Sequence, residues 1–289
     1  GRGMSGLYRS EAAGEAVRAR YAALLERWPV PAEHLRIPTA QGETFVIACG
    51  PKDAPPVVLL HGSMANSASW MGDVGVLAQR FRVYAVDMIG EPGFSAPSRP
   101  PLASGAYAPW LGEVLAGLGV ERPALVGISL GGWLALEYAT RHPERVSAVA
   151  LLCPGGVGHY KNVLPWVLPL MLLGPWGRRR IMARMGGGPP PRDIPEPVRA
   201  FGEFMGQIQA SFRPRTERLP RCDDAALGRL SMPVLAILGG RDVMIDSAGT
   251  RERLEARVPR AEVVWLPKAG HILIGHAETI QRFLVAARG

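Results

Sequence analysis

The chain has 289 residues, of which 47% are hydrophobic and 20% charged, a balance typical of a globular protein with a sizeable core. Its formal net charge of +8 comes from scattered arginines, and the one tight run, at residues 178–180, has no interleaved aromatic residues. A nucleic-acid footprint needs clustered charge, so we expect no nucleic-acid partner. The three cysteines (Cys49, Cys153 and Cys222) are widely separated and form no Cys/His pattern, which argues against a disulfide framework and against a bound metal.

No targeting or membrane-spanning segment is visible in the pattern of apolar residues. The first residues carry Arg2, Arg9 and Glu11 and lack an apolar stretch of secretory length. The longest apolar stretch, residues 163–173, is too short to cross a bilayer and contains two prolines. We therefore expect a cytoplasmic protein without a membrane span, and nothing in the sequence indicates its oligomeric state.

The first predicted elements are a helix and a pair of strands. Residues 10–28 carry apolar side chains at helical spacing, with Val17 and Tyr21 on one face and Ser10 in place to cap the amino end. Two strand-like runs follow, at residues 34–38 and 44–48, and we expect them to pair at an edge of the sheet.

From there, short apolar runs alternate with helical stretches. The runs are 57–60, 83–86, 124–126, 146–152, 234–238 and 263–265, and the main helical stretches are 67–79, 107–118, 130–141 and 276–287. Runs that are apolar on both faces belong in a parallel sheet covered by helices on each side. This alternation predicts an α/β fold.

One interval interrupts the alternation. Between Pro154 and Met232 there is no good strand, but there are helix-like pieces at residues 163–173, 179–185 and 198–212. We interpret residues 155–229 as a helical cap inserted into a core made of residues 1–154 and 230–289.

The strongest chemical signal is the segment 127–131, GISLG, which follows the apolar run 124–126 and opens a predicted helix. A serine on a sharp turn between strand and helix needs small residues two positions away on either side, because side chains there would collide. The amino end of the helix then lies beside Ser129, so the Leu130 amide can donate to a developing oxyanion. The pattern predicts a nucleophilic Ser129, against the alternative of a glycine-rich turn with an incidental serine.

A second loop, residues 61–64 (HGSM), directly follows the run 57–60. A glycine-containing turn at this place supplies the second oxyanion amide of a serine hydrolase site. We expect the Ser63 amide to be that donor, with Met64 as the alternative. An ordinary turn is the competing interpretation of this segment.

The candidate acid and base follow the last two predicted strands. Asp242 comes after the strand that starts at Val234, and a carboxylate at a strand's carboxyl end points into the crevice where such sheets bind ligands. Asp246 is the competing acid, and a turn aspartate that bonds its own backbone is the structural alternative. His271 lies on the loop beyond the run 263–265, which completes the chain order Ser, Asp, His.

Together these four segments resemble the α/β-hydrolase superfamily, from about Leu35 to Ala287. Residues 8–13 (YRSEAA), 28–31 (WPVP) and 37–39 (IPT) look like a bacterial carboxylesterase-like branch with an extra amino-terminal helix. The resemblance implies the α/β-hydrolase fold: a mostly parallel sheet, helices on both faces, and a helical cap between the strands ending near Leu152 and starting near Val234. One segment departs from the family pattern D-x-x-G-x-G-x-S, because residues 87–95 (DMIGEPGFS) are one residue longer, and we expect this loop to be structural.

The resemblance implies cofactor-free hydrolysis of a carboxylic ester through an acyl-enzyme, with a small-molecule ester as the partner. The apolar character of the predicted cap favours a hydrophobic or aromatic ester. Candidate substrate contacts are Met64, Trp166 and Leu170.

Other activities use the same three residues. A serine at position 129 counts against dehalogenases and epoxide hydrolases, which have aspartate there. Carbon–carbon bond hydrolases, thioesterases, lactonases and cofactor-free perhydrolases stay as alternatives, as does a ligand-binding protein of the same fold that lacks turnover.

Overall fold

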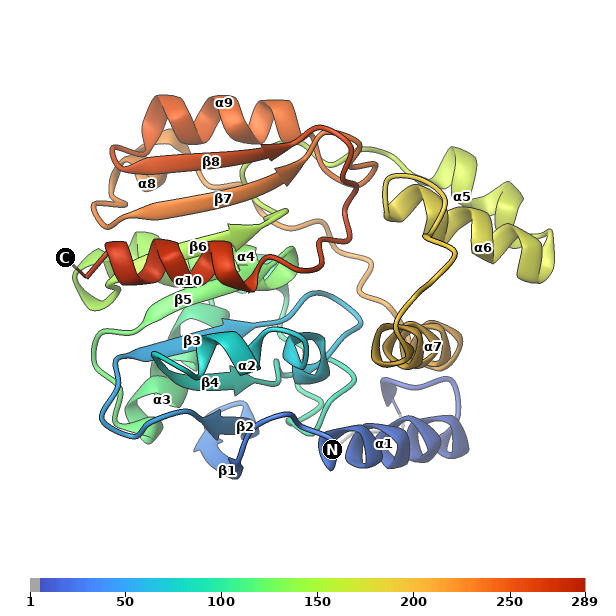
Figure 1. Ribbon diagram of the computed structural model, residues 1–289, viewed down its shortest axis with the longest axis horizontal. Helices are drawn as coiled ribbons and strands as arrows, with labels where there is room; N and C mark the ends of the chain where they lie inside the picture. The colour runs from blue at the N-terminus through green and yellow to red at the C-terminus, as the bar shows by residue number, and fades with distance from the viewer. Residues whose placement is uncertain (1–5, 289) are drawn as a thin grey trace.

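An eight-stranded sheet runs through the middle of the molecule in the order β1-β2-β4-β3-β5-β6-β7-β8 (Figure 1). The structure is a computed structural model, and it describes residues 6–288. β2 pairs antiparallel with β1 and with β4, and all other neighbouring strands pair in parallel. The strands are β1 (Ala32–Thr39), β2 (Gly42–Cys49), β3 (Pro56–Leu60), β4 (Arg82–Val86), β5 (Ala124–Ile128), β6 (Ala148–Leu152), β7 (Val234–Gly239) and β8 (Ala261–Leu266).

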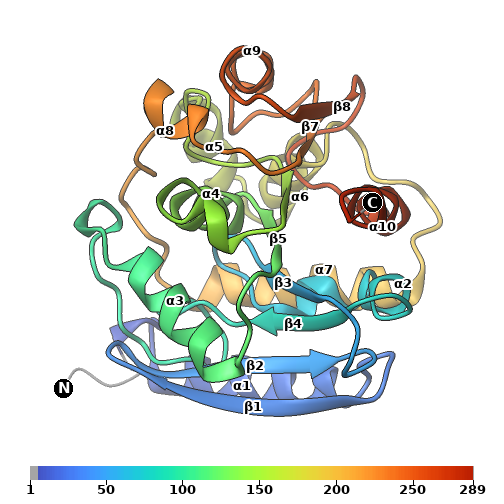
Figure 2. The same cartoon turned by 90° about the vertical axis from the view of Figure 1, so that its left-hand side faces the viewer.

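Helices cover both faces of this sheet, as Figures 1 and 2 show. Successive side chains of a strand point to opposite faces, so Val57 and Leu59 of β3 pack on one side while Val58 and Leu60 pack on the other. The first side is covered by α1 (Glu11–Leu25), α2 (Val74–Leu77), α7 (Glu196–Ser211) and α10 (Ala277–Ala286), and the second by α3 (Tyr107–Leu118), α4 (Leu130–Arg141), α8 (Asp224–Gly228) and α9 (Ser247–Arg257). The predicted architecture, a mostly parallel sheet with helices on both faces, is confirmed.

Several helices differ from the expected ones: α8 was not expected, and α6 (Gly174–Met185) begins five residues before the expected start. The predicted helix 67–79 is divided into a short 3-10 turn, Ser67–Trp70, and the single-turn helix α2. Gly72 and Gly75 lie in this stretch, and glycine costs about 1 kcal/mol relative to alanine inside a helix. Helix α9 was not expected, because Leu254 is its only large buried apolar side chain.

The amino-terminal helix is present as predicted and is joined to the core by polar contacts. Ser10 caps α1, since its side chain accepts a hydrogen bond from the Ala13 amide at 3.1 Å. Further along the helix, the Tyr21 hydroxyl reaches both carboxylate oxygens of Asp87, at 2.9 and 3.0 Å. Asp87 directly follows β4, so α1 is fixed to the loop that departs from the family pattern.

Between β6 and β7 the described chain has helices but no strand. The helices are α5 (Leu164–Met171), α6 (Gly174–Met185), α7 and α8. Figure 1 shows α5 and α6 projecting away from the sheet as a helical hairpin, whereas α8 lies beside α9. The division into a core and a cap at residues 155–229 stays a prediction.

Among the described residues, no helix is both long enough and apolar enough to cross a membrane.

Candidate active site

Ser129 occupies a strained turn between β5 and α4. Its backbone has φ 49° and ψ −106°, and a positive φ is uncommon for a residue with a side chain. The flanking glycines are required by space: a Cβ on Gly127 would collide with the backbone of Gly131, and a Cβ on Gly131 with the backbone of Leu60. The Ser129 amide is held by the Leu152 carbonyl at 2.9 Å. Steric crowding therefore requires glycine at both positions. The positive φ of Ser129 is a backbone strain that is typical of functional sites.

The structure brings the three predicted catalytic residues into one chain of contacts. His271 Nε2 lies 3.2 Å from Ser129 Oγ, and His271 Nδ1 lies 2.8 Å from Asp242 Oδ2. Because the carboxylate can only accept, Nδ1 carries the proton and Nε2 of the neutral ring is free to accept from the serine hydroxyl. This is the geometry of an activated serine nucleophile.

The two candidate acids, Asp242 and Asp246, have separate tasks. The second oxygen of Asp242, Oδ1, accepts from the amides of Met244 at 2.8 Å and Ile245 at 3.0 Å. Asp246 caps α9, with Oδ1 accepting from the Gly249 amide at 3.0 Å. Of the two, only Asp242 contacts the histidine.

The environment of His271 favours its protonated form. Burial of the ring lowers the pKa of His271, but the Cys153 sulfur and the Asp242 carboxylate together outweigh burial, so the pKa is raised above its ordinary 6.5. The Asp242 side chain is fully buried, which strengthens its interaction with the imidazolium.

The predicted oxyanion loop lies beside the serine. A Cβ placed on Gly62 would be 3.9 Å from Ser129 Cβ, so residues 61–64 border the same space. The Met64 amide already donates to Glu91 Oε2 at 3.2 Å. The Ser63 amide is therefore the better candidate donor on this loop, while the Leu130 amide opens α4, where helical amides have no partner in the preceding turn.

His61 shapes this loop and takes no part in the chain of contacts around Ser129. Its Nε2 accepts from the Met88 amide at 2.9 Å, and its Nδ1 donates to the Gly62 carbonyl at 2.7 Å. The buried ring thus ties the end of β3 to the segment after β4.

Behind the oxyanion loop lies a buried ion pair that the sequence did not reveal. Glu91, from the segment that is one residue longer than the family pattern, pairs with Arg215 Nε at 3.1 Å. Arg215 also donates to the Tyr107 hydroxyl at 2.7 Å and to the Ile89 carbonyl at 3.0 Å. Through these contacts the longer loop connects Met64 to the chain that returns from α7.

Three further residues contact members of the predicted triad, and the sequence analysis did not predict these contacts. The Cys153 thiol donates to the His271 carbonyl at 3.1 Å, and the Lys161 ammonium donates to the Asp242 carbonyl at 2.9 Å. The Met185 carbonyl, at the end of α6, accepts from the His271 amide at 2.7 Å. No local pattern signals these contacts, because each joins segments far apart in the chain.

Cys153 also lies close to two members of the predicted triad. Ligand atoms of Cys153, Asp242 and His271 lie within 4.8 Å of one another, a grouping that the scattered cysteines did not predict. Asp242 and His271 are already engaged with each other, so a metal ion at this place would compete with the hydrogen bond that orients the histidine.

The predicted substrate contacts from the cap lie between α5 and α6. Trp166 is half-buried and stacks under the guanidinium of Arg184, 4.2 Å from the ring centre. Leu170 lines a pocket of about 400 Å³ together with Trp176, Arg180 and neighbouring α6 residues.

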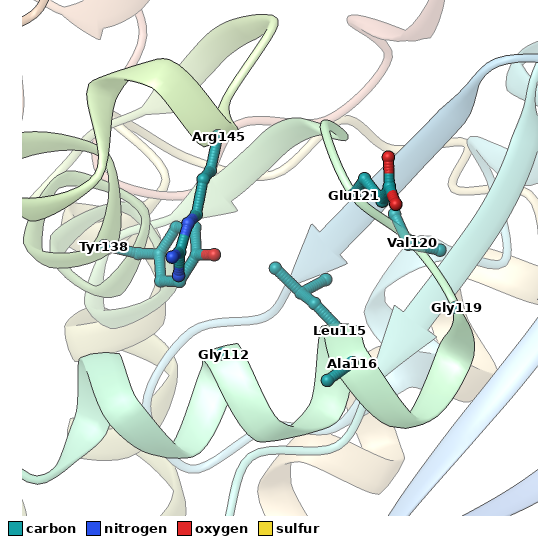
Figure 3. A pocket seen from close by; sticks show the side chains of 8 residues that line it. All are labelled: Gly112, Leu115, Ala116, Gly119, Val120, Glu121, Tyr138 and Arg145. Carbon is teal, nitrogen blue, oxygen red and sulfur yellow. The ribbon is translucent and has the colours of Figure 1, made fainter.

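A second pocket, of about 500 Å³, is unrelated to the triad. Figure 3 shows its walls, which come from α3, α4, the loop at residues 119–121 and Arg145 in the turn after α4. This loop precedes β5, whereas Ser129 follows β5, so the length of a five-residue strand, roughly 16 Å, separates them.

Comparisons with known proteins cover nearly the whole chain. Residues 57–282, which include Ser129, Asp242 and His271, match the model of the Alpha/beta hydrolase family. The chain is 30% identical to the uncharacterized carboxylesterase nap and to carboxylesterase YbfK, both of Bacillus subtilis; the alignments cover 92% and 86% of this chain and 91% and 85% of those proteins. The crystal structures of carboxylesterase CesB (YbfK) and of naproxen esterase, from the same organism, superpose with TM-scores of 0.80 and 0.79 at 27% identity, covering 96% of this chain and 98% of each.

Proposed function

The chain belongs to the α/β-hydrolase family, in its carboxylesterase-like branch, and is a hydrolase that acts on ester bonds; within that activity we propose that it cleaves carboxylic esters of hydrophobic or aromatic small molecules through an acyl-enzyme on Ser129. The observation that carries the mechanism is the chain of contacts Ser129–His271–Asp242, at 3.2 and 2.8 Å. Relatives named as carboxylesterases at 30% identity support the ester as the substrate class.

In the first half of the reaction, neutral His271 takes the hydroxyl proton of Ser129 while Oγ attacks the ester carbonyl carbon. The negative charge that develops on the carbonyl oxygen is stabilised by the amides of Leu130 and Ser63 and by the amino end of α4. His271 then gives its proton to the leaving alcohol, and the acyl group stays on Ser129.

In the second half, His271 removes a proton from water while the water oxygen attacks the acyl carbon. The bond between Ser129 Oγ and the acyl carbon then breaks, His271 returns the proton to Oγ, and the carboxylic acid is released. Asp242 holds the histidine in one tautomer and stabilises the imidazolium in both halves. The backbone amides of Met244 and Ile245 in turn keep the carboxylate of Asp242 in position.

The residues around the triad determine which ester is bound. We assign Met64, Trp166 and Leu170 to the walls that contact the acyl or alcohol group. Met64 lies on the oxyanion loop, and the two cap residues lie on a hairpin whose last carbonyl is bonded to the His271 backbone. Apolar walls of this kind favour hydrophobic or aromatic esters over charged ones.

Replacement of the nucleophile tests the mechanism. Ser129→Ala should lower kcat for a p-nitrophenyl ester by ~10⁴ to 10⁶, because the members of a triad act as a unit. A fluorophosphonate probe should label the wild-type protein at Ser129 only, as read by peptide mass spectrometry. Labelling at another residue, or full turnover by Ser129→Ala, would reject the assignment, and a single slow acylation without product release would favour the ligand-binding alternative.

A further inference from the structure

The α5–α6 hairpin presents an apolar face that no other part of the described chain covers. Leu164, Leu168 and Leu172 follow one another at helical i,i+4 spacing and are 56%, 54% and 87% exposed. No residue of α5 is buried. Met171, Leu173 and Trp176 extend the exposed apolar surface around the turn between the helices. We call this set of six side chains the hairpin face.

A contiguous apolar surface of this kind marks an interaction site in most proteins. The hairpin already has an inner side, where Val163, Trp166, Val167 and Leu170 are partly shielded, so the hairpin face is not needed to hold α5 against α6. The hairpin face is therefore exposed and available to a partner.

The charge around the hairpin face points to the chemistry of that partner. Residues 161–192 contain no Asp or Glu, but they contain Lys161, Arg178, Arg179, Arg180, Arg184 and Arg192. The three arginines 178–180 are exposed on α6, and the Arg180 guanidinium lies 5.1 Å from the ring centre of Trp176, at the border of the hairpin face. Apolar side chains bordered by arginines are typical of helices that lie in the interface of an anionic membrane.

We propose that the α5–α6 hairpin docks on the surface of an anionic phospholipid bilayer, with the hairpin face in the acyl-chain boundary and the arginines at the headgroups. A second copy of the chain fits less well, because a two-fold contact would bring the two arginine clusters together without acidic partners from the hairpin. Each basic residue near an anionic surface instead favours binding.

Docking at this place would put the lipid surface next to the triad. The hairpin is bonded to both triad loops: the Lys161 amide and ammonium donate to Met244 and Asp242 carbonyls, and the Met185 carbonyl accepts from His271 and Ile272. Ile272 and Ile274, beside the base, are themselves 39% and 64% exposed. An apolar ester dissolved in the bilayer would thus reach the site without crossing bulk water.

Vesicle sedimentation tests the docking without any substrate, so the result does not depend on the proposed ester hydrolysis. The full-length protein should partition into vesicles of phosphatidylcholine with 30 mol% phosphatidylglycerol, and binding should fall steeply when NaCl is raised from 0.05 to 0.5 M. The double variant Leu168→Ser/Leu172→Ser and the triple variant Arg178→Gln/Arg179→Gln/Arg180→Gln should each lower the partition coefficient roughly ten-fold or more.

A matched control uses three exposed arginines that precede β4, β5 and β8, at the opposite edge of the sheet: Arg80→Gln, Arg122→Gln and Arg260→Gln. This triple variant has the same net charge as the hairpin variant and should bind vesicles nearly as well as the wild type. If both triple variants lost vesicle binding equally, net charge alone would explain the binding, and the proposal would be overturned. Self-association through the hairpin face, seen in light scattering as a dimer that the Leu168→Ser/Leu172→Ser change dissolves, without vesicle binding, would also overturn it. Unchanged melting temperatures show that the variants are folded.

Discussion

The carboxylates of Asp242 and Asp246 lie four residues apart, but their hydrogen bonds commit them to different tasks. Asp242 joins two backbone amides to the His271 ring, and Asp246 caps the amino end of α9. Both aspartates follow β7 closely, so the sequence placed them near the carboxyl edge of the sheet. Their separate hydrogen-bond partners could be seen only in the fold.

Replacing each aspartate by asparagine should separate the two tasks. Asp242→Asn should lower kcat by roughly 10³ to 10⁴, because an amide can hold His271 in the wrong tautomer. Asp246→Asn should change kcat little, since asparagine is also a good helix cap. Steady-state kinetics with one p-nitrophenyl ester compares the variants, and a reversed order would move the role of the acid to Asp246.

The raised pKa of His271 predicts the pH dependence of the enzyme. Only the neutral ring can accept the Ser129 proton, so kcat/KM should rise with pH and reach half its maximum above pH 6.5. In Asp242→Asn, burial of the ring remains while the carboxylate is lost, so the midpoint of the residual activity should move to lower pH. A pH profile of kcat/KM for both proteins measures this, and an unmoved midpoint would assign the titration to another group.

The buried ion pair between Glu91 and Arg215 should contribute to the free energy of unfolding. The Glu91 and Arg215 side chains are 1% and 4% exposed, so Glu91→Gln leaves a buried guanidinium without its counter-charge. Breaking a buried pair in this way costs about 3–5 kcal/mol of the free energy of unfolding.

Urea unfolding of Glu91→Gln measures this cost. The control is Glu255→Gln, which removes the exposed pair with Arg251 and should cost less than about 1 kcal/mol. Similar midpoints for both variants would show that the buried pair adds no more than a surface pair.

At the scale of elements, helices with a clear apolar face and a clear stop were predicted with their observed bounds. Helix α3 ends at Gly119, whose φ of 70° favours glycine, and α4 ends before the segment His142-Pro143. Helix α9 has a polar surface almost throughout, so periodicity could not reveal it, although Asp246 is a good capping residue. Apolar periodicity therefore finds the helices that build the core and misses those that only shield its rim.

The inner side of the α5–α6 hairpin yields a prediction about specificity. Trp166→Gln and Leu170→Gln should raise KM for bulky or aromatic esters, with much less effect on an acetate ester, because they change the walls and leave the triad intact. A chain-length series of p-nitrophenyl esters, with a methyl ester and an aromatic ester alongside, measures this. Equal losses for all esters, together with a lower melting temperature, would assign both residues to the packing of the hairpin.

At the scale of the whole molecule, the alternation of apolar runs and helical stretches predicted an α/β architecture, and the resemblance of four segments to the α/β-hydrolase superfamily implied the fold. The candidate triad could be predicted because each member directly follows a strand, and parallel strands end at one edge of the sheet. The supporting contacts could not, since Cys153, Lys161 and Met185 approach the triad loops through long-range packing. The Glu91–Arg215 pair joins residues 124 positions apart and has no local pattern at all.

The hydrogen bonds between the end of α6 and the loop of His271 can be followed by hydrogen–deuterium exchange. The amides of His271 and Ile272 both donate to the single carbonyl of Met185, at 2.7 and 3.1 Å. Because α5 has no buried residue, we expect the hairpin to open at a lower free energy than the central strands. Each opening releases those two amides to solvent deuterium while the amides of the central strands stay protected. The exchange rates of these two amides therefore report the opening equilibrium of the hairpin in water. The rates should fall when a surface holds the hairpin closed.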